Sequence, residues 1–146
     1  MFKIDYDDCQ SYEILPEGEY EVIIQDVKVA QTMQGKEHIQ FVLKIRDDVA
    51  GQKYGGRLIF HKVWKRKESG QYPTTEFNSI GKACKLLNGK EYSSMEQLFN
   101  DYKNRNCKVK IKHTEYNGNT YETISKWEVS NLDAPFGTFP QQELPF

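Results

Sequence analysis

The segment RLIFHKVWKRK, which runs from Arg57 to Lys67, combines aromatic rings with positive charges. Its first half is apolar, and its second half places Trp64 beside three consecutive cations, Lys65, Arg66 and Lys67. Single-stranded nucleic acids are bound by such combinations, because bases stack on aromatic rings while phosphates pair with cations. The alternative is a half-buried strand that ends in a solvated charged loop, with Trp64 in the core. The pattern predicts a strand that runs into a basic loop and leaves both interpretations open.

Strand alternation places Phe60 and Trp64 on one face of this segment, together with Leu58 and Lys62. The opposite face carries Ile59, His61 and Val63. Both faces hold apolar residues, so alternation does not decide which of them is buried.

Positive charge is concentrated in the middle of the chain. The net charge of the 146 residues is −1, but residues 51–115 hold 14 lysines and arginines against 6 acidic residues. Residues 1–50 hold 5 against 11, and residues 116–146 hold 1 against 4. A basic middle between acidic ends favours a surface that binds a polyanion, if the basic residues meet on one surface.

The composition indicates one globular domain, with 38% apolar and 28% charged residues. No apolar run approaches the roughly 18 residues that a membrane span needs, and the first residues are acidic, so we expect a cytoplasmic protein with no membrane partner. The three cysteines, Cys9, Cys84 and Cys107, are widely spaced. This spacing argues against a disulfide framework and against a zinc site.

Two strands are expected before the basic segment. A loop at 15–18 leads into the first, EYEVIIQDVKVAQT, which has Tyr20, Val22 and Ile24 on one face and Ile23, Val27 and Val29 on the other. A strand that bends to serve two sides of a small barrel shows this change of face. After a turn at 34–36, the strand HIQFVLKIR alternates between inward Ile39, Phe41, Leu43 and Ile45 and outward His38, Gln40, Val42, Lys44 and Arg46. A glycine-rich loop over 47–56, which contains Tyr54, joins this strand to the basic segment.

Two helices are expected next, after a break at 69–73 that contains Tyr72. Phe77, Ile80, Cys84 and Leu87 follow helical spacing up to Asn88-Gly89, and Ser93 with Glu96 predicts a capping box for the second helix.

Asn117-Gly118 then predicts a hairpin. Its first arm alternates Cys107, Val109 and Ile111 with Lys108, Lys110 and Lys112, and Tyr116 and Tyr121 flank the turn. The lysines either form a cationic ladder or protect an edge strand from aggregation. Trp127, late in the second arm, is expected to close the core.

Three strands, a helical insertion and a two-stranded hairpin form the order of the OB-fold, a five-stranded, partly open barrel. The chain also resembles the single-stranded DNA-binding proteins of phages and prophages of Gram-positive hosts, long known only as a domain of unknown function. The resemblance covers about residues 4–130. It is carried by LPEGEYEV at 15–22, IFHKVW at 59–64, LNGK at 87–90 and the hairpin over 112–118.

The resemblance implies a protein without catalytic residues, metal or cofactor that binds single-stranded DNA in replication, recombination and repair. Fold and resemblance together give residues 1–130 as the DNA-binding domain, with a possible homo-oligomer. The expected DNA contacts are Lys44, Arg46, Tyr54, Arg57, Phe60, Lys62, Trp64, Lys65, Arg66, Lys67, Tyr72, Lys108, Lys110, Lys112, Tyr116 and Tyr121.

Residues 131–146 are expected to form a disordered tail, because they hold three of the five prolines and show no periodicity. The last residues, Glu143, Leu144, Pro145 and Phe146, are similar to the tip by which bacterial single-stranded DNA-binding proteins recruit replication and repair enzymes. This tail departs from that pattern because only Glu143 is acidic near its end.

Three other functions stay open. Asp26-x-Lys28, with Asp7 or Asp8, is a minimal form of a metal-dependent nuclease motif, although such chemistry needs several converging carboxylates. A protein adaptor would use the barrel and the tail without touching DNA. An oligosaccharide binder fits the expected fold, but it has no need for three lysines on one strand.

Overall fold

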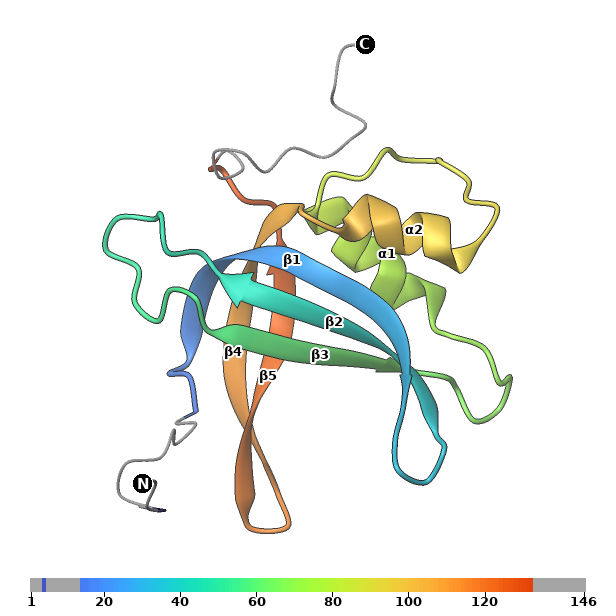
Figure 1. Cartoon of the computed structure of the whole chain (residues 1–146), viewed down its shortest axis with the longest axis horizontal. Helices are drawn as coiled ribbons and strands as arrows, with labels where there is room; N and C mark the ends of the chain where they lie inside the picture. Colours follow the sequence, from blue (N-terminus) through green and yellow to red (C-terminus); the bar gives the residue numbers. More distant parts are fainter. Residues whose placement is uncertain (1–3, 5–13, 133–146) are drawn as a thin grey trace.

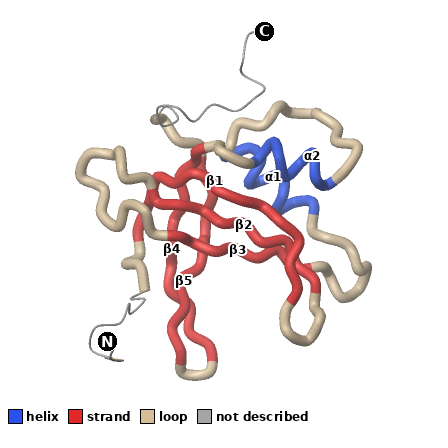
Figure 2. The backbone as a smooth tube through the Cα atoms, viewed as in Figure 1, coloured by secondary structure: helices blue, strands red, loops and turns tan. Residues whose placement is uncertain are grey.

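The computed structural model describes residue 4 and residues 14–132. It contains five strands, β1 (Gly18–Gln31), β2 (Glu37–Ile45), β3 (Leu58–Trp64), β4 (Asn106–Tyr116) and β5 (Asn119–Glu128). The helices α1 (Thr74–Ala83) and α2 (Met95–Tyr102) lie between β3 and β4 in the chain and gather at one end of the sheet (Figures 1 and 2). The predicted mainly β class and element order are therefore confirmed. Neither helix of the described residues is long and apolar enough to cross a membrane.

The strands form one antiparallel sheet in the order β3-β2-β1-β4-β5. β1 is the central strand and curves strongly (Figure 1). Its pairing with β2 shifts between Ile24 and Asp26, which leaves Gln25 as an extra residue in a β-bulge. The bulge returns Val27 to the buried side that Val22 and Ile24 occupy. The prediction that Val27 faces the opposite side from them is wrong for this reason.

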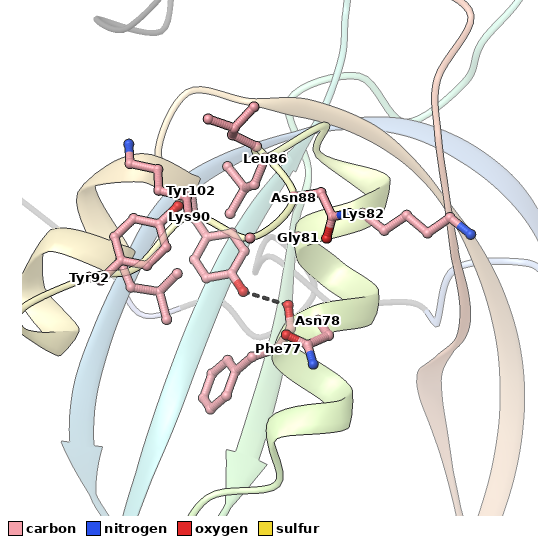
Figure 3. A pocket seen from close by; sticks show the side chains of 12 residues that line it. Phe77, Asn78, Gly81, Lys82, Leu86, Asn88, Lys90, Tyr92 and Tyr102 are labelled. Atoms are coloured by element: carbon pink, nitrogen blue, oxygen red, sulfur yellow. Dashed lines mark hydrogen bonds between the residues drawn. The ribbon is translucent and has the colours of Figure 1, made fainter.

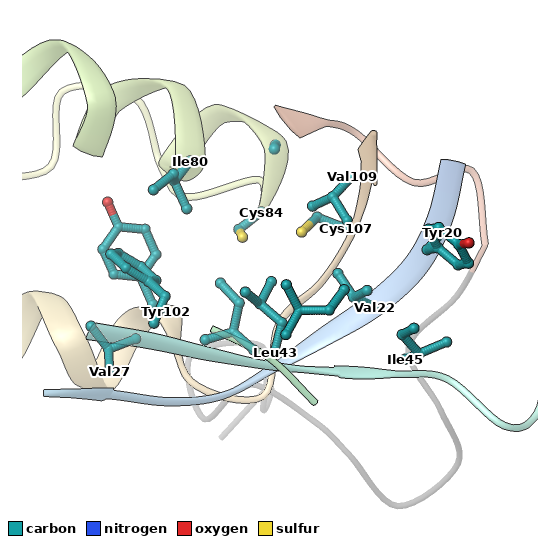
Figure 4. Close-up of a cluster of buried hydrophobic side chains, with 14 of the residues drawn as sticks. Tyr20, Val22, Val27, Leu43, Ile45, Ile80, Cys84, Tyr102, Cys107 and Val109 are labelled. Carbon is teal, nitrogen blue, oxygen red and sulfur yellow. The ribbon is translucent and has the colours of Figure 1, made fainter. Parts of the chain in front are cut away.

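The curved sheet folds its two halves against each other around the core. Ile39, Phe41, Leu43 and Ile45 on β2 are fully buried, as predicted. The Phe41 ring centroid lies 6.2 Å from that of Trp127 on β5 and 5.2 Å from that of Tyr102 on α2. Figure 4 shows side chains from β1, β2, β4, α1 and α2 meeting in this cluster, with Cys84 and Cys107 as neighbouring free thiols. Because the two halves pack through their inner faces, their outer faces point to opposite sides of the molecule.

The sheet is not closed, because β3 and β5 are its two edges. Side chains nevertheless cross the gap between them. Arg57 binds Glu122 at 3.0 Å, and the His61 ring centroid lies 5.3 Å from that of Trp127. The buried Leu15 lies at the same gap, where its backbone N–H donates to Glu122 Oε2 at 2.8 Å.

Both helix boundaries differ from the prediction. α1 ends at Ala83, and the chain then closes with Leu86 N–H donating to Gly81 C=O and Lys85 N–H to Lys82 C=O, the two bonds of a Schellman motif. Leu87 consequently lies outside the helix and is 74% exposed. In α2 the N-cap is Ser94, one residue later than predicted: Ser94 Oγ accepts from the Gln97 N–H at 3.3 Å, and Gln97 Oε1 accepts from the Ser93 N–H at 3.1 Å.

The predicted hairpin is confirmed. Asn117 and Gly118 have φ angles of 53° and 79°, as the two central residues of a type I′ turn require. Trp127 packs against the hydrophobic core, as predicted.

Candidate nucleic-acid interface

The structure decides which side of β3 is buried. Ile59 and Val63 face the core, whereas Leu58 and Phe60 are 37% and 56% exposed. Lys62 is also exposed and Trp64 is half-buried. Phe60 and Trp64 therefore lie on the outer face of the strand, where a ligand has access to them.

The cross-strand register makes this face continuous with the outer face of β2. Phe60 is opposite Val42, Lys62 is opposite Gln40, and Leu58 is opposite Lys44. On the other side of β2, Lys28 of β1 is opposite Gln40. We call the outward residues of these three strands the β2–β3 face: Lys28, His38, Gln40, Val42, Lys44, Leu58, Phe60, Lys62 and Trp64.

Trp64 is surrounded by groups that can bind anions. Its cross-strand partner is His38, whose ring centroid lies 4.6 Å away. The ammonium groups of Lys36 and Lys62 lie 4.8 Å and 5.9 Å from the Trp64 ring centroid. Each such cation–π contact is worth about 0.5–1 kcal/mol at an exposed site. Lys36 reaches Trp64 from the turn between β1 and β2, so this turn forms one border of the face.

Lys65 and Tyr72 are held by Glu37 at the end of the face. Glu37 Oε2 lies 2.7 Å from Lys65 Nζ and accepts a 2.6 Å hydrogen bond from the Tyr72 hydroxyl. The hydrogen bond from Lys65, followed by that from Tyr72, lowers the pKa of Glu37. Burial and the Glu37 carboxylate raise the pKa of Tyr72. Both residues thus fasten the loop after β3, in which Arg66 and Lys67 are exposed.

Two arginines that were predicted to contact DNA form ion pairs within the protein. Arg46 does not point outward as expected, because it is only 6% exposed and binds Asp48 with an N–O distance of 2.8 Å. The hydrogen bond from Arg46 lowers the pKa of Asp48. Arg57 is paired with Glu122 across the gap between β3 and β5. Lys44, two positions before Arg46, is exposed on the β2–β3 face.

The lysines of β4 lie on the opposite outer face. Cys107, Val109 and Ile111 are fully buried, so Lys108, Lys110 and Lys112 point away from the core on the far half of the sheet. Lys108 lies 3.5 Å from Glu19 and 3.4 Å from Glu128. The cationic ladder is therefore partly neutralised and separate from Phe60 and Trp64.

The other three predicted tyrosine contacts lie outside β2 and β3. Tyr116 and Tyr121 are exposed near the tip of the β4–β5 hairpin, which extends past β3 in Figure 1. Tyr54 is exposed in the loop between β2 and β3, where its ring lies edge-on to Tyr20 at 6.5 Å.

A family model described as "Protein of unknown function (DUF669)" matches residues 2–136. The chain belongs to this family. No curated protein matches the chain. The match spans the whole sheet and both helices of this DUF669 protein, and it ends before the predicted partner-binding residues Glu143 to Phe146. Those residues also lie outside the part of the chain that the structure describes.

Sequence reasoning missed two lysines of this DUF669 protein: Lys28, on the β2–β3 face, and Lys36, at its border. In the sequence, Lys28 belongs to the Asp26-x-Lys28 nuclease motif, and Lys36 belongs to the expected turn at 34–36. The cross-strand pairing that places Lys28 beside Gln40 is given by the folded sheet, whose register shifts at the bulge in β1. Recognising Lys36 required its distance from Trp64, which only the folded chain gives.

The nuclease motif does not assemble in the described part of this DUF669 protein. Asp26 lies 3.4 Å from Lys103 and accepts a hydrogen bond from the Val27 N–H. No cluster of three or more histidine, cysteine, aspartate or glutamate side chains suited to a metal occurs within residue 4 and residues 14–132. Asp7 and Asp8 lie outside the described residues.

A cavity of about 720 Å³ lies in the helical region of the DUF669 protein, between α1, α2 and the segment that joins them. Phe77, Leu86 and Leu98 give it an apolar lining, and Lys82 and Lys90 stand among its polar residues. Within it the Tyr102 hydroxyl donates to the Phe77 carbonyl at 2.6 Å (Figure 3). None of the predicted DNA contacts lines this cavity.

Proposed function

We propose that this protein binds single-stranded DNA without reading its sequence, on the β2–β3 face. The observation that carries the proposal is the outward pair Phe60 and Trp64 with Lys62 between them, on a face that also carries Lys44. An exposed ring on a strand is costly to hydrate and offers a flat surface to any base. Because every base has such a surface, stacking of this kind tolerates all sequences.

The spacing of these groups suits an extended strand of nucleic acid. Phe60 and Trp64 are four positions apart on one strand, or roughly 13 Å at about 3.3 Å per residue. In our proposal the two rings stack bases that belong to one bound segment, and Lys62 and Lys44 neutralise phosphates along it. Each stacked base contributes roughly 1–3 kcal/mol.

We further propose that the sheet is an OB-fold barrel left open between β3 and β5. The support is the position of both helices between the third and fourth strands and the side-chain contacts Arg57–Glu122 and His61–Trp127 across the gap. In this fold, oligonucleotides bind on strands 2 and 3 and the adjoining loops. Lys44, Phe60, Lys62 and Trp64 lie on that same pair of strands.

The biological role that we propose is protection of single-stranded DNA in phage replication, recombination and repair, with partner enzymes recruited through Glu143 to Phe146. The resemblance of residues 4–130 to phage single-stranded DNA-binding proteins supports the first part. An apolar Leu-Pro-Phe segment that follows an acidic residue is suited to an apolar pocket with a basic rim, which supports the second part. Removing residues 144–146 is expected to abolish partner pull-down and to leave DNA affinity unchanged.

The decisive experiment is a titration of the protein with a labelled thymidine oligonucleotide, followed by fluorescence anisotropy over a series of salt concentrations. We expect binding that weakens with salt, with a log–log slope of roughly −0.7 for each phosphate neutralised. Phe60→Ala should weaken binding by about 1–3 kcal/mol. Leu87→Ala, which also removes an exposed apolar side chain but in the helical region, is the matched control and should leave affinity unchanged.

A protein adaptor that does not bind DNA is the second candidate. The cavity between α1 and α2 favours it, because an apolar lining next to the exposed Leu87 suits a peptide side chain. No oligonucleotide binding at low salt, together with loss of a protein partner in Leu87→Ala, would select this function over DNA binding.

A further inference from the structure

His38 is buried without a hydrogen-bond partner on the face that we propose to bind DNA. It is 3% exposed, and neither Nδ1 nor Nε2 forms a hydrogen bond among the described residues. Trp64 packs against it from β3, opposite His38 in the register and with its ring centroid 4.6 Å away. A polar side chain in this state is uncommon, because buried polar groups in folded proteins normally have partners.

The missing hydrogen bonds make the burial of His38 against Trp64 costly in free energy. A neutral imidazole has one donor and one acceptor, and burial removes the water that would otherwise serve both. Trp64 itself is only half-buried and stands at the last position of β3. Its ring can therefore leave His38 without disturbing the core, and departure returns partners to both nitrogens.

The surroundings of Trp64 indicate what takes its place. Lys36 and Lys62 bring two ammonium groups within 4.8 Å and 5.9 Å of the ring centroid, from the β1–β2 turn and from β3. His38, whose ring neighbours that of Trp64, contributes an N–H. Two cations and one N–H donor that all neighbour the same ring supply the kinds of group that bind an oxyanion.

We propose that Lys36, His38 and Lys62 form a phosphodiester subsite that Trp64 covers in the free protein. This inference rests on the proposed function. When single-stranded DNA binds, Trp64 leaves His38 and stacks on a base, and a phosphate of the same strand takes the N–H of His38 and the two ammonium groups. The phosphate thus satisfies a donor that the free protein leaves without a partner. His38 is a DNA-contacting residue in the bound state only.

The test compares two substitutions of His38 in the full chain. His38→Phe keeps a ring beneath Trp64 and removes both nitrogens, so it should weaken the binding of a thymidine oligonucleotide about tenfold, the value of one charge-assisted hydrogen bond. His38→Gln keeps an N–H donor and should stay within about threefold of the wild type. Thermal unfolding should show that His38→Phe is at least as stable as the wild type, because it removes two polar atoms without partners.

A double-mutant cycle separates a shared phosphate from a structural role. If Lys36 and His38 hold one phosphate, the double variant Lys36→Gln/His38→Phe should bind more tightly than the product of the two single losses predicts. If the loss of affinity in the double variant equals the product of the two single losses, the two residues do not share a phosphate and the subsite is overturned. Unchanged affinity in His38→Phe would also overturn the subsite and would leave the proposed function standing. No binding by the wild type at low salt would overturn the proposed function, and the subsite with it.

Discussion

Lys44 and Arg46 are both basic, stand two positions apart at the end of β2, and have different surroundings in the folded chain. The Lys44 side chain is exposed on the β2–β3 face, whereas Arg46 is buried against Asp48. An exposed lysine next to an apolar surface is available to a phosphate. A buried arginine in a two-point contact with a carboxylate contributes to stability instead.

Matched substitutions should separate these two roles. Lys44→Gln is expected to make the log–log slope of DNA affinity against salt concentration less steep by about 0.7, with little change in the free energy of unfolding. Arg46→Gln is expected to lower the free energy of unfolding by about 1–3 kcal/mol and to leave the salt dependence unchanged. Urea unfolding and anisotropy titrations measure the two quantities. A reduced salt slope in Arg46→Gln would show that its guanidinium leaves Asp48 for the DNA.

The sequence alone could not make this distinction. Alternation placed Lys44 and Arg46 on the same outward face of a regular strand, but β2 ends at Ile45, so alternation does not extend to Arg46. The same limit applies to Phe60 and Trp64, since both sides of β3 carry apolar residues. Their exposure depends on which side of β3 meets β5 and α1, and this is a long-range property of the fold.

Within a single strand or turn, the sequence predicts the features that neighbouring residues determine. The alternating pattern of β2 and the Asn117-Gly118 turn are confirmed because neighbouring residues determine them. The end of α1 was predicted too late because its stop signal is not a glycine. Lys85 adopts a φ of 62° to close the Schellman motif, a conformation that most residues avoid.

Lys85→Gly is expected to stabilise the protein by about 1 kcal/mol, because glycine adopts a positive φ without the steric penalty of a side chain. This corresponds to a rise in the melting temperature of roughly 3–5 °C for a chain of this length. Lys82→Gly, three residues earlier and inside α1, is the control and should lower stability by about 0.5–1 kcal/mol. Thermal unfolding checks both, and destabilisation by Lys85→Gly would contradict the strain argument.

Asp101 connects α2 to the segment that precedes it. Its carboxylate binds Arg105 at 2.8 Å, lies 3.4 Å from Lys90, and accepts a hydrogen bond from the Tyr92 hydroxyl. Burial acts to raise the pKa of Asp101, but the hydrogen bonds from Tyr92 and Arg105 outweigh it and lower that pKa. The stabilising contribution is therefore complete above the unfolded pKa of about 4 and is lost as the pH falls through the lower folded value.

Asp101→Asn should therefore lower the free energy of unfolding at pH 7 by about 3 kcal/mol, as expected for breaking a buried ion pair. It should also make stability less dependent on pH below about 4, because the group that titrates there is gone. Urea unfolding between pH 7 and pH 3 measures both effects. Glu68→Gln, in the exposed loop after β3, is the control and should change neither quantity. If Asp101→Asn lost stability at acid pH as steeply as the wild type, Asp101 would not be the group that titrates there.

At the scale of the whole molecule, the curvature of the sheet divides the basic residues between two sides. The packing of Phe41 on Trp127 fixes this division, because it turns the inner faces of β2 and β5 toward each other. The basic middle of the sequence therefore does not become one basic surface. Lys36, Lys44 and Lys62 lie on or beside the β2–β3 face, and Lys108, Lys110 and Lys112 lie on the opposite side, where Glu19 and Glu128 accompany them.

Two triple substitutions with equal loss of charge should therefore act differently on a short thymidine oligonucleotide. Glutamine at 36, 44 and 62 should reduce the salt slope by about 1.4, since Lys36 and Lys62 share one phosphate, Lys44 neutralises a second, and each phosphate contributes roughly 0.7. Glutamine at 108, 110 and 112 should reduce it by less than about 0.5, because that side is remote from the stacking rings and carries its own carboxylates. A general loss of electrostatic attraction would lower both slopes equally. Equal reductions in the two variants would therefore contradict a DNA site confined to the β2–β3 face.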